Sequence, residues 1–188
     1  MGQIIATGGV RVSLHRAMMR IGGLAAAALA IACASGDDSA APDRVILHFD
    51  TAVVRLATPH DTLRLVTELA YTPDQHSVGL MERHHLPDSA GMLFTYASTQ
   101  PDTAAYWMYR TRLPLDIAFI DSAGAIRTIR HMVPCPTTLP EGCPSYPAGA
   151  PFRAALEVNA GYFARHRVDV GDHVVLGDTV GRLRAARR

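Results

Sequence analysis

Short apolar runs separated by turn residues dominate the chain from Val45 onward. Residues 63–70 (LRLVTELA) alternate apolar and polar side chains, which is typical of a strand with one buried face. Tight-turn sequences such as residues 121–124 (DSAG) separate neighbouring runs. We therefore expect strands over residues 45–49, 52–57, 63–70, 91–96, 105–109, 115–121, 125–132, 152–158 and 173–176.

Two segments predict short helices instead. Residues 72–75 (TPDQ) are typical of a helix start, with a capping threonine, a proline at the first helical position and a glutamine at the capping-box position. We expect this helix to run to about Met81, and a second one to follow residues 159–161 and end near His166. Many short strands with two short helices predict a mostly β (α+β) fold, a compact β-sandwich or barrel-like single domain over residues 44–180.

The N-terminus predicts export. Arg11, Arg16 and Arg20 precede an apolar run over residues 21–32, and the first 36 residues contain no acidic side chain. As a helix the run would extend about 18 Å, whereas a bilayer core is about 30 Å thick. We therefore expect residues 1–32 to be a signal peptide rather than a membrane span or a buried helix.

Cys33 is the expected site of a lipid anchor. It directly follows the small-residue cleavage sequence Ala30-Ile31-Ala32, although Ala30 stands where lipoprotein signals usually have Leu. Cys33 is also the odd one among three cysteines, and lipidation explains an unpaired cysteine in an exported protein. We expect a lipoprotein of the cell envelope, with a soluble periplasmic or secreted form as the alternative. Residues 33–43 would form a flexible tether and residues 181–188 a basic tail.

Charge and motifs exclude several functions. All 18 basic residues are Arg, which removes Lys-dependent Schiff-base and phosphate-loop chemistry. Without residues 1–32 the chain carries about two more acidic than basic groups and no strongly basic patch, so we expect no nucleic-acid partner. The sequence contains no dinucleotide fingerprint, hydrolase elbow or zinc-protease helix, and we expect no cofactor and no metal.

An ordered set of segments carries a family resemblance: TPDQHSVGLM (72–81), GMLFTY (91–96), YWMYRTRLPLDIAFID (106–121), VPCP with CPSY (133–146), and LEVNAG with VGDHV (156–174). The chain resembles the family known as domain of unknown function 192. The resemblance implies a compact, largely β domain, often behind a signal peptide, and supplies no catalytic residues. The chain departs from the family pattern at His76, usually Arg, and at Tyr109 and Arg110, usually Lys-Asn.

Cys135 and Cys143 flank a proline-rich loop. In an oxidising compartment we expect a disulfide, and closing a nine-residue loop stabilises the fold by about 2.5 kcal/mol on the chain-entropy model. A metal site would need two further ligands, and a redox-active pair would more often have the Cys-x-x-Cys spacing. Both remain alternatives for this pair.

Trp107 is the centre of the candidate ligand site. Its run is mostly apolar, so core packing is one interpretation; the other is a pocket whose polar rim includes Arg110, Asp116 and Tyr146. If Asp116 is buried at the start of its strand, we expect an ion pair with Arg110 or Arg112.

Two further candidates are acidic or basic side chains on strands. His131 could form an acid–base pair with Asp116 if the strands bring the two together. We expect Glu157, between Leu156 and Val158, to point out of the sheet or to pair with an Arg.

The sequence therefore predicts a non-catalytic binding module of the envelope, attached to a membrane through its lipid anchor. Its ligand would be a small molecule, a glycan or a protein, bound near Trp107 and the cysteine loop. A periplasmic hydrolase using Asp116 and His131, or a thiol or metal role for Cys135 and Cys143, are the alternative functions.

Overall fold

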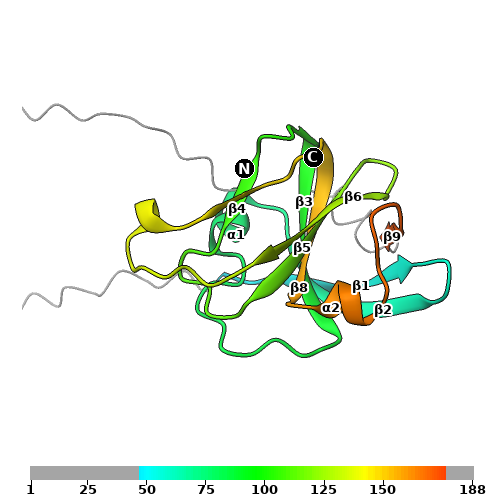
Figure 1. The fold of residues 1–188 in the computed structure, drawn as a ribbon, viewed down its shortest axis with the longest axis horizontal. Coiled ribbons are helices and arrows are strands. Elements are labelled where there is room, and N and C mark those ends of the chain that lie inside the picture. The colour runs from blue at the N-terminus through cyan, green and yellow to red at the C-terminus, as the bar shows by residue number, and fades with distance from the viewer. Residues whose placement is uncertain (1–46, 177–188) are drawn as a thin grey trace, which may run out of the picture. The chain divides into compact units, whose positions relative to one another are not determined.

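The computed structural model describes residues 47–176, which form a β-rich domain (Figure 1). A seven-stranded sheet curls into a half-barrel in the order β6-β5-β8-β3-β2-β1-β9, and β4 and β7 form a separate two-stranded sheet. The strands are β1 (Asp50–Ala57), β2 (Thr62–Ala70), β3 (Ala90–Gln100), β4 (Ala105–Trp107), β5 (Leu115–Ile120), β6 (Ile126–Met132), β7 (Ser145–Pro147), β8 (Phe152–Asn159) and β9 (His173–Leu176). The helices are α1 (Pro73–Val78), the 3-10 turn η1 (Pro140–Gly142) and α2 (Tyr162–Arg165).

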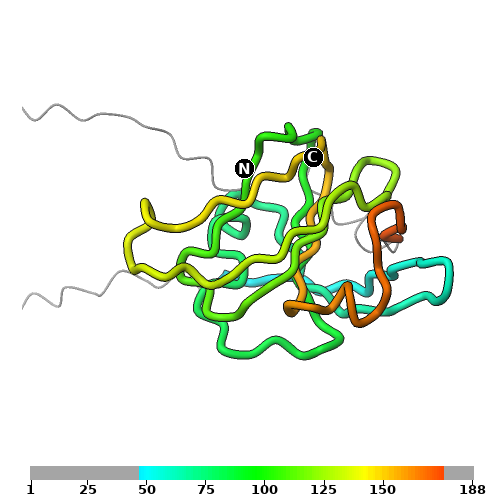
Figure 2. The backbone as a smooth tube through the Cα atoms, viewed as in Figure 1, coloured from blue at the N-terminus to red at the C-terminus, as the bar shows by residue number. Residues whose placement is uncertain are grey.

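Most neighbouring strands of the large sheet run antiparallel, as short connections allow. The exception is β2 and β3, which pair in parallel and are joined by a crossover that contains α1. Figure 2 follows this crossover in the backbone trace. The predicted turn between β5 and β6 is present: an Asp121 carboxylate oxygen accepts hydrogen bonds from the backbone N–H groups of Ala123 and Ala125.

The middle of the sheet is covered on both faces. All six residues of β5 and five consecutive residues of β8 are buried. One core lies between α2 and the strands of the curled sheet, β1 among them, and the other packs β4 and the loop after α1 against the sheet. The sequence of a strand covered on both faces is a continuous apolar run and does not alternate between apolar and polar residues. The mostly β fold expected from the sequence is confirmed.

Helix α1 begins as predicted and ends earlier. The Thr72 hydroxyl accepts from the Gln75 N–H, and the Gln75 side chain accepts from the Thr72 N–H, so both halves of the capping box are present. The helix stops at Val78 and not near Met81, because Gly79 has φ 48° and turns the chain away from the helix axis.

The strand expectations need correction at three places. Residues 47–49 are not a strand, β4 ends at Trp107 and not at Tyr109, and β7 was not expected. The expected signal peptide, lipidated Cys33, tether and basic tail fall outside the described residues. None of the helices in residues 47–176 has the length and apolar character needed to cross a membrane.

Candidate functional site

A narrow pocket of about 30 Å³ opens beside the C-terminal end of α1. That is room for about one or two water molecules. The pocket lies where the segments that carry the family resemblance meet, and its lining belongs to four of them. The lining residues are His76, Ser77, Val78, Gly79, Leu80, Met81, Phe94, Tyr106, Trp107, Thr111 and Glu157.

Glu157 is the buried acid of this pocket. It is 5% exposed and lies on β8 between Met92 of β3 and Ile117 of β5, within the apolar face of the sheet. Among residues 47–176 its carboxyl group makes no hydrogen bond or ion pair. Burial raises its pKa from 4.5 to about 8, so the group is mostly uncharged at neutral pH. The expectation that Glu157 points outward or pairs with an Arg is therefore wrong.

Trp107 supplies a second unsatisfied group. Its indole Nε1 is fully buried and has no hydrogen-bond partner in the described domain. Trp107 comes from β4, which β7 holds in place through the pairs Tyr106–Tyr146 and Trp107–Ser145. Trp107, which the sequence placed at the ligand site, thus lines a pocket.

Aromatic rings and a neutral imidazole form the rest of the wall. Phe94 and Tyr106 pack edge to face with ring centroids 5.2 Å apart. The Tyr106 hydroxyl is hydrogen-bonded to the Tyr96 hydroxyl, and burial raises the pKa of Tyr106 well above 10. Burial also lowers the pKa of His76, whose Nε2 lies 3.0 Å from the Ala70 carbonyl oxygen. The pocket therefore contains no cationic group at neutral pH.

A wider cleft of about 380 Å³ adjoins the pocket and shares Thr111 with it. Its lining comes from the loops after α1 and β4 and from the cysteine loop: Glu82, Tyr109, Arg110, Thr111, Arg112, Pro134, Cys135, Thr137 and Thr138. Glu82 accepts hydrogen bonds from the Nε groups of Arg110 and Arg112, at 2.8 and 2.6 Å. These two hydrogen bonds lower the pKa of Glu82, with Arg110 the larger cause.

The backbone at Arg110 explains one departure from the family pattern. Arg110 and Glu82 both adopt left-handed conformations, with φ 55° and 58°, and the Glu82 N–H donates to the Arg110 carbonyl. Asn tolerates this region better than most residues, so the Asn usual at this position suits the turn. Arg110 keeps the same turn, and its side chain is held by Glu82.

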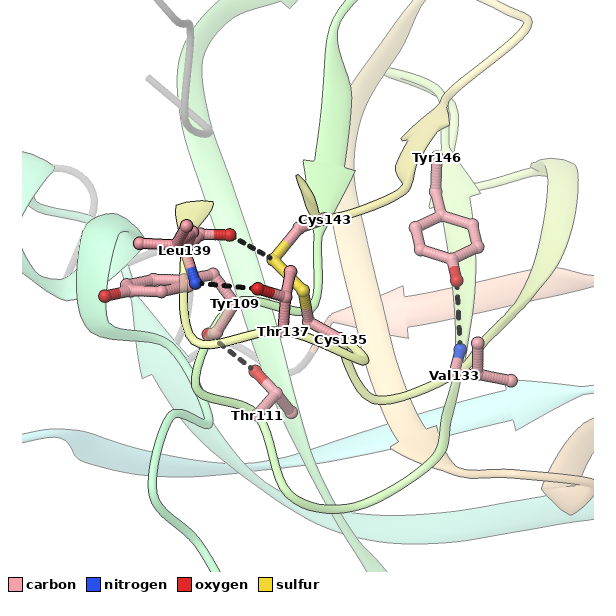
Figure 3. The surroundings of a disulfide bond; sticks show 8 residues. All are labelled: Tyr109, Thr111, Val133, Cys135, Thr137, Leu139, Cys143 and Tyr146. Atoms are coloured by element: carbon pink, nitrogen blue, oxygen red, sulfur yellow. Dashed lines mark hydrogen bonds between the residues drawn. A yellow bond between two sulfur atoms is a disulfide. The ribbon is translucent and has the colours of Figure 1, made fainter. Parts of the chain in front are cut away.

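The cysteine loop forms one wall of the cleft (Figure 3). Cys135 and Cys143 are at disulfide distance, with sulfur atoms 2.10 Å apart, so in this state neither is a free thiol. Tyr109 and Thr111 lie beside the loop in Figure 3. Tyr146 does not line the cleft; its hydroxyl accepts from the Val133 N–H at 3.1 Å and holds the base of the loop. Within residues 47–176 no cluster of side chains could hold a metal ion.

Asp116 lies apart from the pocket and the cleft. One of its carboxylate oxygens is 2.9 Å from Nδ1 of His131, and the other accepts from the Gly161 N–H at 2.8 Å. The expected ion pair with Arg110 or Arg112 does not form, because both arginines bind Glu82. The expected Asp116–His131 pair does exist, with the His131 side chain 61% exposed and the Asp116 side chain 9% exposed.

The expected site residues are therefore not brought together. Trp107 lines the pocket, Arg110 lines the cleft, and Asp116 and Tyr146 line neither. Glu157 was not among the expected binding residues. The sequence did hold one indication of this residue, its position. An acidic side chain inside the apolar run 152–158 indicates a buried carboxyl group when both faces of that strand are covered.

The fold and the pocket define a class of protein: a single β-rich half-barrel domain with a small aromatic pocket that holds a buried acid. The chain belongs to the family described as "DUF192, Uncharacterized ACR", whose model matches residues 55–176. No curated protein matches the chain.

Two solved structures are similar to this domain. One is a protein of Sinorhizobium meliloti 1021 with the provisional name of transcription regulator; it is 36% identical, with 69% of this chain and 96% of that chain covered and a TM-score of 0.61. The other is a protein of unknown function from Novosphingobium aromaticivorans DSM 12444; it is 32% identical, with 66% and 84% covered and a TM-score of 0.58.

Proposed function

We propose that the protein is an exported envelope protein, attached to a membrane by a lipid at Cys33, whose domain binds a small molecule, glycan or protein without transforming it. The observation that carries the binding function is the cleft of about 380 Å³ beside the Trp107 pocket. This volume lies in the range of about 300–1,000 Å³ that is usual for ligand sites. The cleft also offers the mixture of groups that orients ligands, with an aromatic ring at Tyr109, guanidinium groups and hydroxyls.

The proposed anchor rests on the arginine-rich leader, the short apolar run and the unpaired Cys33. A Cys33→Ser variant should leave the membrane fraction and appear in the aqueous periplasmic or secreted fraction. Mass spectrometry of the wild-type protein should find a lipid on the residue at position 33. Continued membrane retention of an unlipidated variant would contradict the lipid anchor but would not bear on the proposed binding site.

An Arg112→Ala variant tests the binding site. Native mass spectrometry of protein taken from the envelope should find a non-covalent ligand, and the variant should retain at least tenfold less of it. Arg127→Ala is the matched control, because the two side chains are 54% and 56% exposed and both belong to ion pairs. Arg127 pairs with Asp121, which lines a second cleft of about 340 Å³. An equal loss in both variants, or a loss in the control alone, would contradict the assignment.

The Asp116–His131 pair supports a second candidate function, a hydrolase. A carboxylate that holds Nδ1 of an imidazole leaves Nε2 available as a general base, here at an exposed position. The pair lines neither the pocket nor the two clefts, which favours the binding function. Hydrolysis of a chromogenic ester that a His131→Gln variant loses completely, with an unchanged fold, would favour the enzyme instead.

The provisional name of the Sinorhizobium meliloti protein is not transferred to this chain. A recognition helix must reach along the DNA major groove, and α1 and α2 have only six and four residues. The net acidic character of the chain after removal of the leader also disfavours binding to a phosphate backbone.

A further inference from the structure

We propose that the Trp107 pocket receives an uncharged hydroxyl group, as carried by an alcohol or a sugar, which bridges the indole N–H of Trp107 and the carboxyl group of Glu157. This inference rests on the proposed binding function and specifies the chemistry of the ligand end that enters the pocket.

The first group is the Trp107 indole N–H. It can only donate a hydrogen bond, it is fully buried, and the described domain provides no acceptor for it. A buried donor without a partner costs about 1–3 kcal/mol. A ligand atom that accepts a hydrogen bond at this position would recover that energy, which gives the pocket a preference for acceptors.

The second group is the Glu157 carboxyl. It is 95% buried, lines the same pocket and makes no hydrogen bond or ion pair among residues 47–176. Protonated or ionised, a carboxyl group can accept a hydrogen bond from a ligand O–H. A hydroxyl group both donates and accepts, so a single hydroxyl can satisfy Glu157 and Trp107 together.

The charges of the lining disfavour an ionised ligand group. No arginine lines the pocket, and the pKa of its one histidine is lowered by burial, so an anion that left water for the pocket would find no cation to offset the loss of its hydration. A cation would gain from an ionised Glu157, but it would face the Trp107 N–H and leave that donor without an acceptor. The neutral hydroxyl avoids both costs.

The size of the pocket limits what enters. About 30 Å³ holds the tip of a ligand and not its body. The adjoining cleft can hold the rest, since Thr111 lines both hollows. The walls formed by Phe94, Tyr106 and Trp107 suit the C–H groups next to a hydroxyl.

Three probes of equal chain length test the inference: 1-propanol, propylammonium and propionate. The protein contains a single Trp, so one indole N–H resonance in a nitrogen–proton spectrum reports the pocket. At pH 7 we expect 1-propanol to shift this resonance saturably, and the two ions to bind at least tenfold more weakly. Charged probes that bind as well as 1-propanol would overturn the inference.

Variants at Glu157 give the matched control. Glu157→Gln keeps an acceptor and should retain 1-propanol binding, whereas Glu157→Leu removes it and should leave only a linear solvent shift. If Glu157→Leu does not fold, the ratio among the three probes on the wild-type protein decides alone. The absence of a saturable shift with any probe would mean that the pocket holds water only. That result would overturn this inference but not the proposed function, which the Arg112→Ala comparison tests separately.

Discussion

At pH 8 a Glu157→Gln variant is expected to be more stable than the wild-type protein, by up to about 5 kcal/mol. The carboxyl group of Glu157 has a pKa of about 8 in the folded protein against 4.5 when exposed. Between these two values the folded state binds more protons than the unfolded state. The free energy of unfolding therefore falls as the pH rises, by up to about 1.4 kcal/mol per pH unit, and this contribution levels off above pH 8.

The glutamine side chain has nearly the same shape and does not titrate, so the variant lacks this part of the pH dependence. Urea unfolding at intervals from pH 4.5 to pH 9 measures the difference. The curves of variant and wild type should meet near pH 4.5 and diverge toward pH 8. Glu141→Gln is the control, because Glu141 is exposed on the cysteine loop, and its curve should follow the wild type. Parallel curves for Glu157→Gln and wild type would show that the buried carboxyl is not protonated in the fold.

The sequence predicted the strands well because most of them leave a local trace. The alternation in residues 63–70 records a strand with one buried face, and β2 covers it as Thr62–Ala70. The capping box of α1 is likewise local, since all of its groups lie within four residues. By contrast, β7 has only three residues in a proline-rich stretch, and its pairing with β4 depends on residues about 40 positions away.

The same distinction separates the predicted from the unpredicted parts of the site. Trp107 was recognised as an aromatic ring among apolar residues, which composition alone reveals. The partner of Arg110 is Glu82, 28 residues earlier, and no local pattern distinguishes it from Asp116 as a partner. Glu157 was misjudged because its neighbours in sequence show only that it lies in a strand. Its burial follows from the packing of β4 and of the loop after α1 on that face, which is a property of the tertiary structure.

Replacement of Cys135 and Cys143 by Ser together is expected to lower the free energy of unfolding by about 2.5 kcal/mol. The bond closes a loop with a sequence separation of eight residues, and this loop contains only the short turn η1. The loop therefore has little regular backbone hydrogen bonding of its own, and the disulfide is the main restraint on its conformations. Urea unfolding of the oxidised wild type and the double variant at one pH measures the loss.

The disulfide should also matter for binding, because the same loop is a wall of the cleft. Cys135 itself lines the cleft with three of its neighbours in sequence, whereas the pocket takes no residue from the loop. We therefore expect the double variant to lose affinity for a ligand that lies in the cleft, while 1-propanol still shifts the Trp107 resonance. In the wild type, dithiothreitol should lower the affinity for the cleft ligand and leave the response of the Trp107 resonance to 1-propanol unchanged. It should change neither in the double variant. A reductant effect of equal size in both proteins would place its origin elsewhere than in this bond.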